Sequence, residues 1–352
     1  MNTEADGLYP PNDAPETTNS QLPIQQPPST QNRIFFGADG LRAGWSLLMF
    51  VAMLVVLIFV VGLVARKLVP PNPTSSATHE LSLRSTFLNE AIPFLVIFLV
   101  TWVMSKIERR PNSVYGLGGQ RPFARFFAGL GWGAVCLSLL ILTLWKTGHL
   151  VIDSRLLFGG SVFSYGTLWL IGFLLVGLFE EYLTRGYLQY TLTRGLAGKY
   201  QWAFKTRHSA ALGFWTAALV FSVLFGLGHG SNPGESPIGL LSAGLVGFVF
   251  CLSLWRTGSL WWAIGFHASW DWAQSYLYGV ADSGLMVQHH LLATHPMGTA
   301  ILSGGTTGPE GSIFILAVLF IIALIIIFTL PRTGGGYAAN LPANRVQAQQ
   351  TA

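Results

Sequence analysis

The sequence is poor in charged residues and in cysteine. Only 10% of its 352 residues are charged, whereas about a quarter are charged in an ordinary soluble domain. This deficit argues against a soluble protein. The two cysteines, Cys136 and Cys251, lie inside apolar runs, and so small a number in such surroundings excludes a disulfide framework.

The N-terminus lacks the features of a secretory signal peptide. Acidic residues such as Glu4 and Asp6 stand where a signal peptide has basic ones, and no apolar stretch follows closely. Its richness in Pro, Ser, Thr, Asn and Gln predicts a disordered tail over residues 1–40. A second disordered tail, rich in Gly, Ala, Asn and Gln, is expected over residues 333–352.

Long apolar runs are what the chain has in abundance. Hydrophobic residues make up 51% of the sequence, its mean hydropathy is +0.50, and several runs reach the roughly 20 residues that cross a ~30 Å hydrocarbon layer. We therefore predict an all-α polytopic membrane bundle of about eight transmembrane helices. The expected spans are residues 45–65, 87–104, 127–145, 165–192, 210–227, 238–255, 260–278 and 312–330.

The basic residues indicate the orientation of these spans. If the N-terminus is inside, 15 of the 20 Lys and Arg residues fall in inner segments and 5 in outer ones, as the positive-inside rule requires. We expect an integral, multi-pass protein of a bacterial cytoplasmic membrane with both termini cytoplasmic. Membrane topology explains the net charge of +5 better than binding to nucleic acid does. The basic residues lie in short loops between apolar runs rather than on one face.

Four acidic residues lie at membrane depth: Glu90, Glu180, Glu181 and Asp271. A charge at the bilayer centre costs at least ~2.5 kcal/mol, so such groups face a protein or water-filled interior and have a function. Glu180 and Glu181 point about 100° apart on one helix. Glu181 and Arg185 have the i, i+4 spacing of a helical ion pair, which leaves Glu180 as a candidate base. The alternative is a buried Glu–Arg network that only locks helices together.

Two histidines join the acids inside apolar runs. A lone histidine in such a place is more often a core residue than a functional one. Two histidines, His229 and His267, together with a carboxylate pair favour a functional site instead. Asp271 follows His267 by one helical turn, so its carboxylate can accept a ring N–H and fix the tautomer. We expect a turn near residues 195–208, which places Glu180 roughly 21 Å and His229 roughly 30 Å from it along their helices.

These residues form three motifs in order on separate apolar helices: Glu180-Glu181-x-x-x-Arg185, Phe225-x-x-x-His229 and His267-x-x-x-Asp271. Over residues 165–278 the set resembles the CPBP family of intramembrane proteases, which includes the CAAX prenyl endoproteases and bacteriocin-immunity proteins. That family often has Asn at the position of Asp271.

The resemblance implies hydrolysis of a peptide bond in a membrane-associated protein or peptide. Glu180 would activate water, and His229 and His267 would stabilise the oxyanion or bind a metal, zinc if any, with a glutamic mechanism favoured. Glu181, Arg185 and Asp271 complete the expected site. We expect transmembrane helices 1–3 in residues 41–160, a catalytic core in 161–280, and the last loop and helix 8 in 281–332.

Two other functions fit the same residues. In the first, the polar cluster assembles a non-catalytic scaffold or a bacteriocin-immunity factor. In the second, the intramembrane carboxylates and histidines form the relay of a proton-coupled transporter, although they gather in one cluster and no paired half-helices are evident.

Overall fold

The computed structural model describes residues 34–37, 39–68, 80–330, 337 and 341. Each of the eight expected spans coincides with helical structure, so the predicted all-α membrane bundle is confirmed. The longer helices are α1 (Ala43–Leu68), α2 (Leu83–Ile107), α3 (Pro122–Lys146), α4 (Gly160–Tyr182), α5 (Gln189–Phe204), α6 (Ser209–Gly228), α7 (Pro237–Thr257), α8 (Trp261–Asp271) and α10 (Ile315–Thr329).

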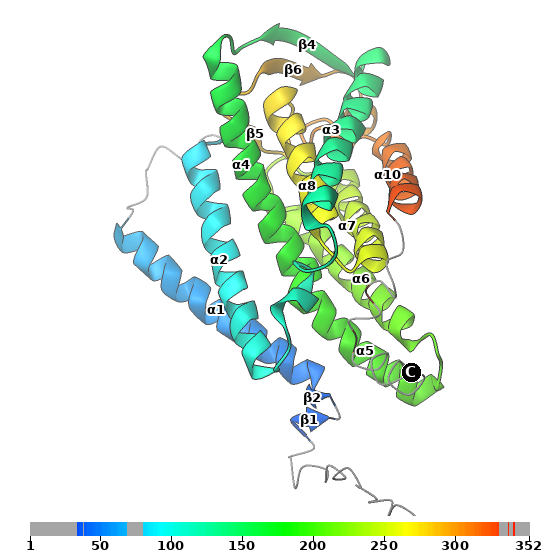
Figure 1. Cartoon of the computed structure of the whole chain (residues 1–352). Coiled ribbons are helices and arrows are strands. Elements are labelled where there is room, and N and C mark those ends of the chain that lie inside the picture. The colour runs from blue at the N-terminus through cyan, green and yellow to red at the C-terminus, as the bar shows by residue number, and fades with distance from the viewer. Residues whose placement is uncertain (1–33, 38, 69–79, 331–336, 338–340, 342–352) are drawn as a thin grey trace, which may run out of the picture.

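Short elements connect these helices. The short helical elements are η1 (Asn112–Tyr115), the π-helical η2 (Leu183–Leu188) and η4 (Trp272–Leu277), η3 (His229–Ser231), α9 (Ala300–Ser303) and η5 (Pro309–Gly311). The strands pair as β1 (Phe36–Gly37) with β2 (Gly40–Leu41), β3 (Glu80–Leu81) with β5 (Met286–Val287), and β4 (Leu150–Arg155) with β6 (Leu292–Pro296). Figure 1 shows β4 and β6 across one end of the bundle and β1 and β2 at the other.

The length and surface of the helices match a membrane protein. Within the described residues, six helical stretches are long and apolar enough to cross a bilayer. Large apolar side chains face outward on peripheral helices, for example Phe59 of α1, 65% exposed, and Phe328 of α10, 82% exposed. Lipid is the solvent in which such surfaces are stable.

The fourth span is longer than expected. α4, η2 and α5 form one helical stretch from Gly160 to Phe204, so the turn to α6 occupies only 205–208 instead of 195–208. The polar sequence of α5 gave the appearance of a loop, but its Arg194 is buried and lies 3.7 Å from the Glu108 carboxylate. The longer helix places Glu180 about 36 Å and His229 about 30 Å from the turn, which brings them closer to a common level.

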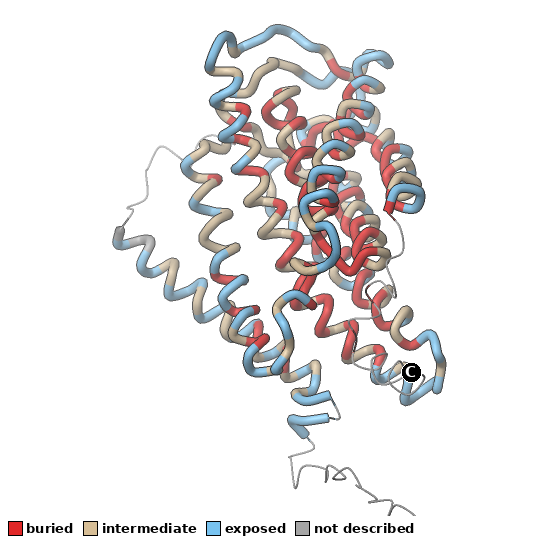
Figure 2. Tube along the Cα trace, viewed as in Figure 1, coloured by how far each residue is buried: buried red, intermediate tan, exposed pale blue. Residues whose placement is uncertain are grey.

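Helix α8 lies at the centre of the bundle, among α3, α4 and α7 (Figure 1), and is mostly buried (Figure 2). Glycines allow its close packing on α3. A Cβ at Gly129 would lie 2.1 Å from the Trp262 carbonyl oxygen, and one at Gly133 would lie 2.2 Å from the Phe266 carbonyl oxygen. Small residues four positions apart allow two membrane helices to approach this closely. Their fit fixes the position of the helix that carries His267.

The two predicted tails lie largely outside the described residues. Within residues 1–40, the β1–β2 hairpin is an ordered element that the composition did not predict. In the second tail, Tyr337 and Leu341 are buried, at 1% and 2% exposure, and the Tyr337 ring lies 4.7 Å from that of Phe214. Apolar burial holds these two positions against the bundle.

Candidate active site

Glu181 and Arg185 form the expected ion pair. The Arg185 Nη1 lies 2.6 Å from Glu181 Oε1, and both side chains are almost completely buried. Arg185 also donates from Nε to the Gly247 carbonyl at 3.2 Å, and its guanidinium lies 4.9 Å from the ring of Phe225. The buried charges are thus matched, as buried ions must be.

His267 stands among three carboxylates. Its Nδ1 is 3.0 Å from Glu181 Oε1, and its Nε2 lies 3.4 Å from Asp271 Oδ2 and 3.6 Å from Glu180 Oε2. The expected approach of Asp271 to the ring is present, but the shorter contact is with Glu181, which the sequence paired only with Arg185. Glu181 therefore joins the ion pair to the imidazole and orients the ring.

His229 comes from the end of α6. Its Nδ1 lies 2.8 Å from the Phe225 carbonyl oxygen, and since a carbonyl only accepts, Nδ1 carries the proton and Nε2 is left for other contacts. The ring of Phe225 lies 4.7 Å from the His229 ring and 6.5 Å from the His267 ring. Phe225 thus lies close to both imidazoles and to the buried guanidinium of Arg185.

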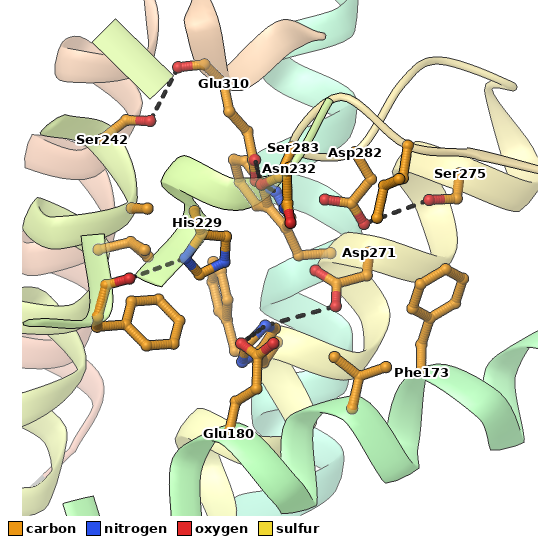
Figure 3. A pocket seen from close by; sticks show the side chains of 18 of the residues that line it. Phe173, Glu180, His229, Asn232, Ser242, Asp271, Ser275, Asp282, Ser283 and Glu310 are labelled. Carbon is orange, nitrogen blue, oxygen red and sulfur yellow. Dashed lines mark hydrogen bonds and ion pairs between the residues drawn. The ribbon is translucent and has the colours of Figure 1, made fainter. Parts of the chain in front are cut away.

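Glu180, His229, His267 and Asp271 line one cavity of about 250 Å³. Figure 3 shows Glu180 reaching into it from one side, opposite Glu310, with His229 and Asp271 on the walls between them. The other polar residues of the lining are Glu90, Asn232, Ser242, Ser275, Asp282, Ser283 and Glu310. Glu180 Oε2 is buried and has no hydrogen-bond partner. A carboxylate oxygen of this kind is available to a water molecule or a substrate.

Sequence reasoning missed much of this lining. Asp282 and Glu310 belong to the loop between α8 and α10, which the bundle pattern treated as a connection. Trp270 donates to Glu310 Oε1 at 2.7 Å, and Ser275 donates to Asp282 Oδ2 at 3.3 Å. Burial raises the pKa of both carboxyls above its usual range, and the charge of Asp271 raises that of Asp282 further. Only their unusual position after a histidine-containing span could have drawn attention to them.

The donor geometry does not fit a metal centre. Zinc would be held by Glu180, His229 and His267, yet no group of three or more His, Cys, Asp or Glu side chains in the described part of the chain could hold a metal ion. One nitrogen of each imidazole contacts another protein group, Phe225 for His229 and Glu181 for His267, an arrangement that zinc-bound histidines also have. What the described residues lack for a metal site is therefore the grouping of the ligands, not a free ring nitrogen.

The comparison with known families agrees with the motifs. Residues 162–273 match the family model described as "Type II CAAX prenyl endopeptidase Rce1-like". The match includes all three motifs and leaves α1–α3, the loop with Asp282 and Glu310, and α10 outside it. No curated protein and no solved structure matches the chain significantly. The resemblance to the CPBP family is confirmed over this segment, and it indicates a CAAX-type intramembrane endopeptidase.

Proposed function

We propose that this chain, whose residues 162–273 belong to the CPBP family of intramembrane proteases, hydrolyses a peptide bond by a glutamate-dependent mechanism in the cavity of Glu180. Its substrate is a membrane-associated protein or peptide. The observation that carries the proposal is the convergence of Glu180, His229, His267 and Asp271, from three helices, on one cavity inside an apolar bundle.

Glu180 acts as the general base. Its Oε2, which has no hydrogen-bond partner, takes a proton from a water molecule, whose oxygen attacks the carbonyl carbon of the scissile bond. The same proton then passes to the leaving amine as the C–N bond breaks, so the carboxylate is regenerated. The apolar helices around the cavity keep bulk water away from the reacting groups.

The two imidazoles stabilise the oxyanion. His267 with both nitrogens protonated donates from Nδ1 to Glu181 and presents Nε2–H to the cavity, and His229 presents Nε2, which donates when protonated. Donors that are already in position for the developing charge contribute about 10²–10³ in rate each. Arg185 and Asp271 support the mechanism by holding Glu181 and His267.

The test is cleavage of labelled membrane-embedded peptides by purified protein in vesicles. Glu180→Gln keeps the shape of the side chain but cannot take a proton, so cleavage is expected to vanish while expression and thermal stability remain. Wild-type turnover by this variant would overturn the assignment. Solute flux without any cleaved product would favour a transporter instead.

A chelator provides the second arm of this test. Exhaustive metal removal should leave the rate of wild-type cleavage unchanged. Loss of activity that added zinc restores would reject the glutamate mechanism in favour of a metalloprotease, while keeping the protease assignment.

A further inference from the structure

Glu90 is one of the carboxyl groups of the cavity that have no part in the mechanism above. Glu90 belongs to α2, outside the segment that matches the family, and it lines the same cavity as Glu180. Its Oε2 is buried without a hydrogen-bond partner, as is Oε2 of Glu180. Two carboxyl oxygens that lack partners therefore border a single cavity, which a membrane-embedded structure does not keep without a function.

Glu90 lies among other acidic groups in this cavity. It shares the lining with Glu180 and His267, and neither Lys nor Arg is present in that lining. The other titratable groups of the lining are His229, Asp271, Asp282 and Glu310. The buried guanidinium of Arg185 lies outside this lining and pairs with Glu181, 2.6 Å away.

We propose that Glu90 is a positioning residue that shares one proton with Glu180, an inference that rests on the proposed function. Two carboxyls that border one cavity of low dielectric do not both ionise, and their protons leave in two separate steps. Glu90 holds the shared proton, so Glu180 remains the ionised base. The protonated Glu90 donates a hydrogen bond toward Glu180 or its water and keeps a second negative charge away from the forming oxyanion.

Substitutions of Glu90 test whether its protonated carboxyl donates a hydrogen bond in the cavity. Glu90→Met removes the donor and should lower kcat by about tenfold to a hundredfold, the effect of a lost hydrogen bond to a charged group. Glu90→Gln imitates the neutral acid and should restore most of that loss. The matched control is Glu80→Gln, which removes an exposed carboxylate of β3 outside the cavity and should change nothing.

The pH profile distinguishes proton sharing from a structural role. Wild-type kcat/KM should fall at alkaline pH as Glu90 loses its proton, and Glu90→Gln should lose that part of the fall, because its amide cannot ionise. The inference is overturned if the Glu90→Gln profile superimposes on the wild type, if Glu90→Met is fully active, or if Glu90→Gln is as inactive as Glu90→Met. Glu180→Gln in the same assay tests the protease assignment itself. The role of Glu90 can therefore be wrong while the protease assignment holds.

Discussion

At the scale of single residues, the imidazole of His267 is held by unequal contacts. Glu181 Oε1 lies 3.0 Å from Nδ1, whereas Asp271 Oδ2 lies 3.4 Å from Nε2. Asp271 makes the longer contact, and a neutral side chain can take its place. Glu181 makes the shorter contact and also forms the buried ion pair with Arg185. The two acids therefore differ in how much substitution they tolerate.

We predict that Asp271→Asn keeps kcat/KM within about tenfold of the wild type, because the amide oxygen still accepts from the ring. Asp271→Leu has no acceptor and should lose about 10–100-fold, which is the usual effect of removing the partner that orients a functional histidine. Peptide cleavage by the two variants, at equal thermal stability, measures the difference. Equal rates for Asn and Leu would contradict the orienting role.

At the scale of elements, the packing of α8 on α3 controls where His267 lies. Gly129→Ala would place a methyl group against the Trp262 carbonyl, 2.1 Å from its oxygen. The helices must then separate, at a cost of about 1–3 kcal/mol or more, and His267 moves with α8. We expect a lower unfolding temperature together with reduced cleavage.

Gly131 provides the matched control for this prediction. It lies on the same helix, and a Cβ there would meet nothing within 4 Å. Gly131→Ala should therefore be neutral or slightly stabilising, since alanine has the higher helix propensity by about 1 kcal/mol. If both variants behave alike in detergent melting curves, close helix packing is not the reason for the glycine at 129.

The sequence predicted helices well and connections poorly. Apolar runs mark the spans because lipid demands them, and the i, i+4 spacing of Glu181 and Arg185 predicted their ion pair. The continuation of α5 to Phe204 could not be predicted from the local sequence. Arg194 is buried there because it pairs with Glu108, which is distant in sequence. Asp282 and Glu310 were missed for the same reason. Their burial depends on how the loop folds back over the cavity, which no local pattern encodes.

At the scale of the whole molecule, the half-buried loop carboxyls Asp282 and Glu310 make stability depend on pH. Burial raises the pKa of Glu310 above its usual range, so the folded protein holds a proton that the unfolded chain releases. Stability is then fully present below the unfolded pKa and is lost as the pH rises through the folded pKa. We predict that the melting temperature in detergent decreases from mildly acidic to alkaline pH.

Glu310→Gln should weaken that decrease. The amide oxygen can still accept from Trp270, whose Nε1 lies 2.7 Å from the Glu310 carboxylate, so the variant removes the titration and keeps the contact. Glu80→Gln, which alters an exposed carboxyl, should retain the wild-type slope. An unchanged slope in Glu310→Gln would show that other groups cause the pH dependence.

The orientation of the bundle decides on which side of the membrane the cavity loop lies. The 15 to 5 distribution of Lys and Arg predicts that the N-terminus is inside. In that orientation β4 and the loop between α8 and α10 lie outside, and the α5–α6 turn lies inside. Cys136 and Cys251 are each only 1% exposed, so added cysteines can be labelled over a low background. A membrane-impermeant maleimide should label Ser154→Cys on intact cells and Gln201→Cys only after lysis. The reverse pattern would place Asp282 and Glu310 on the cytoplasmic side and require substrates to reach the cavity from there.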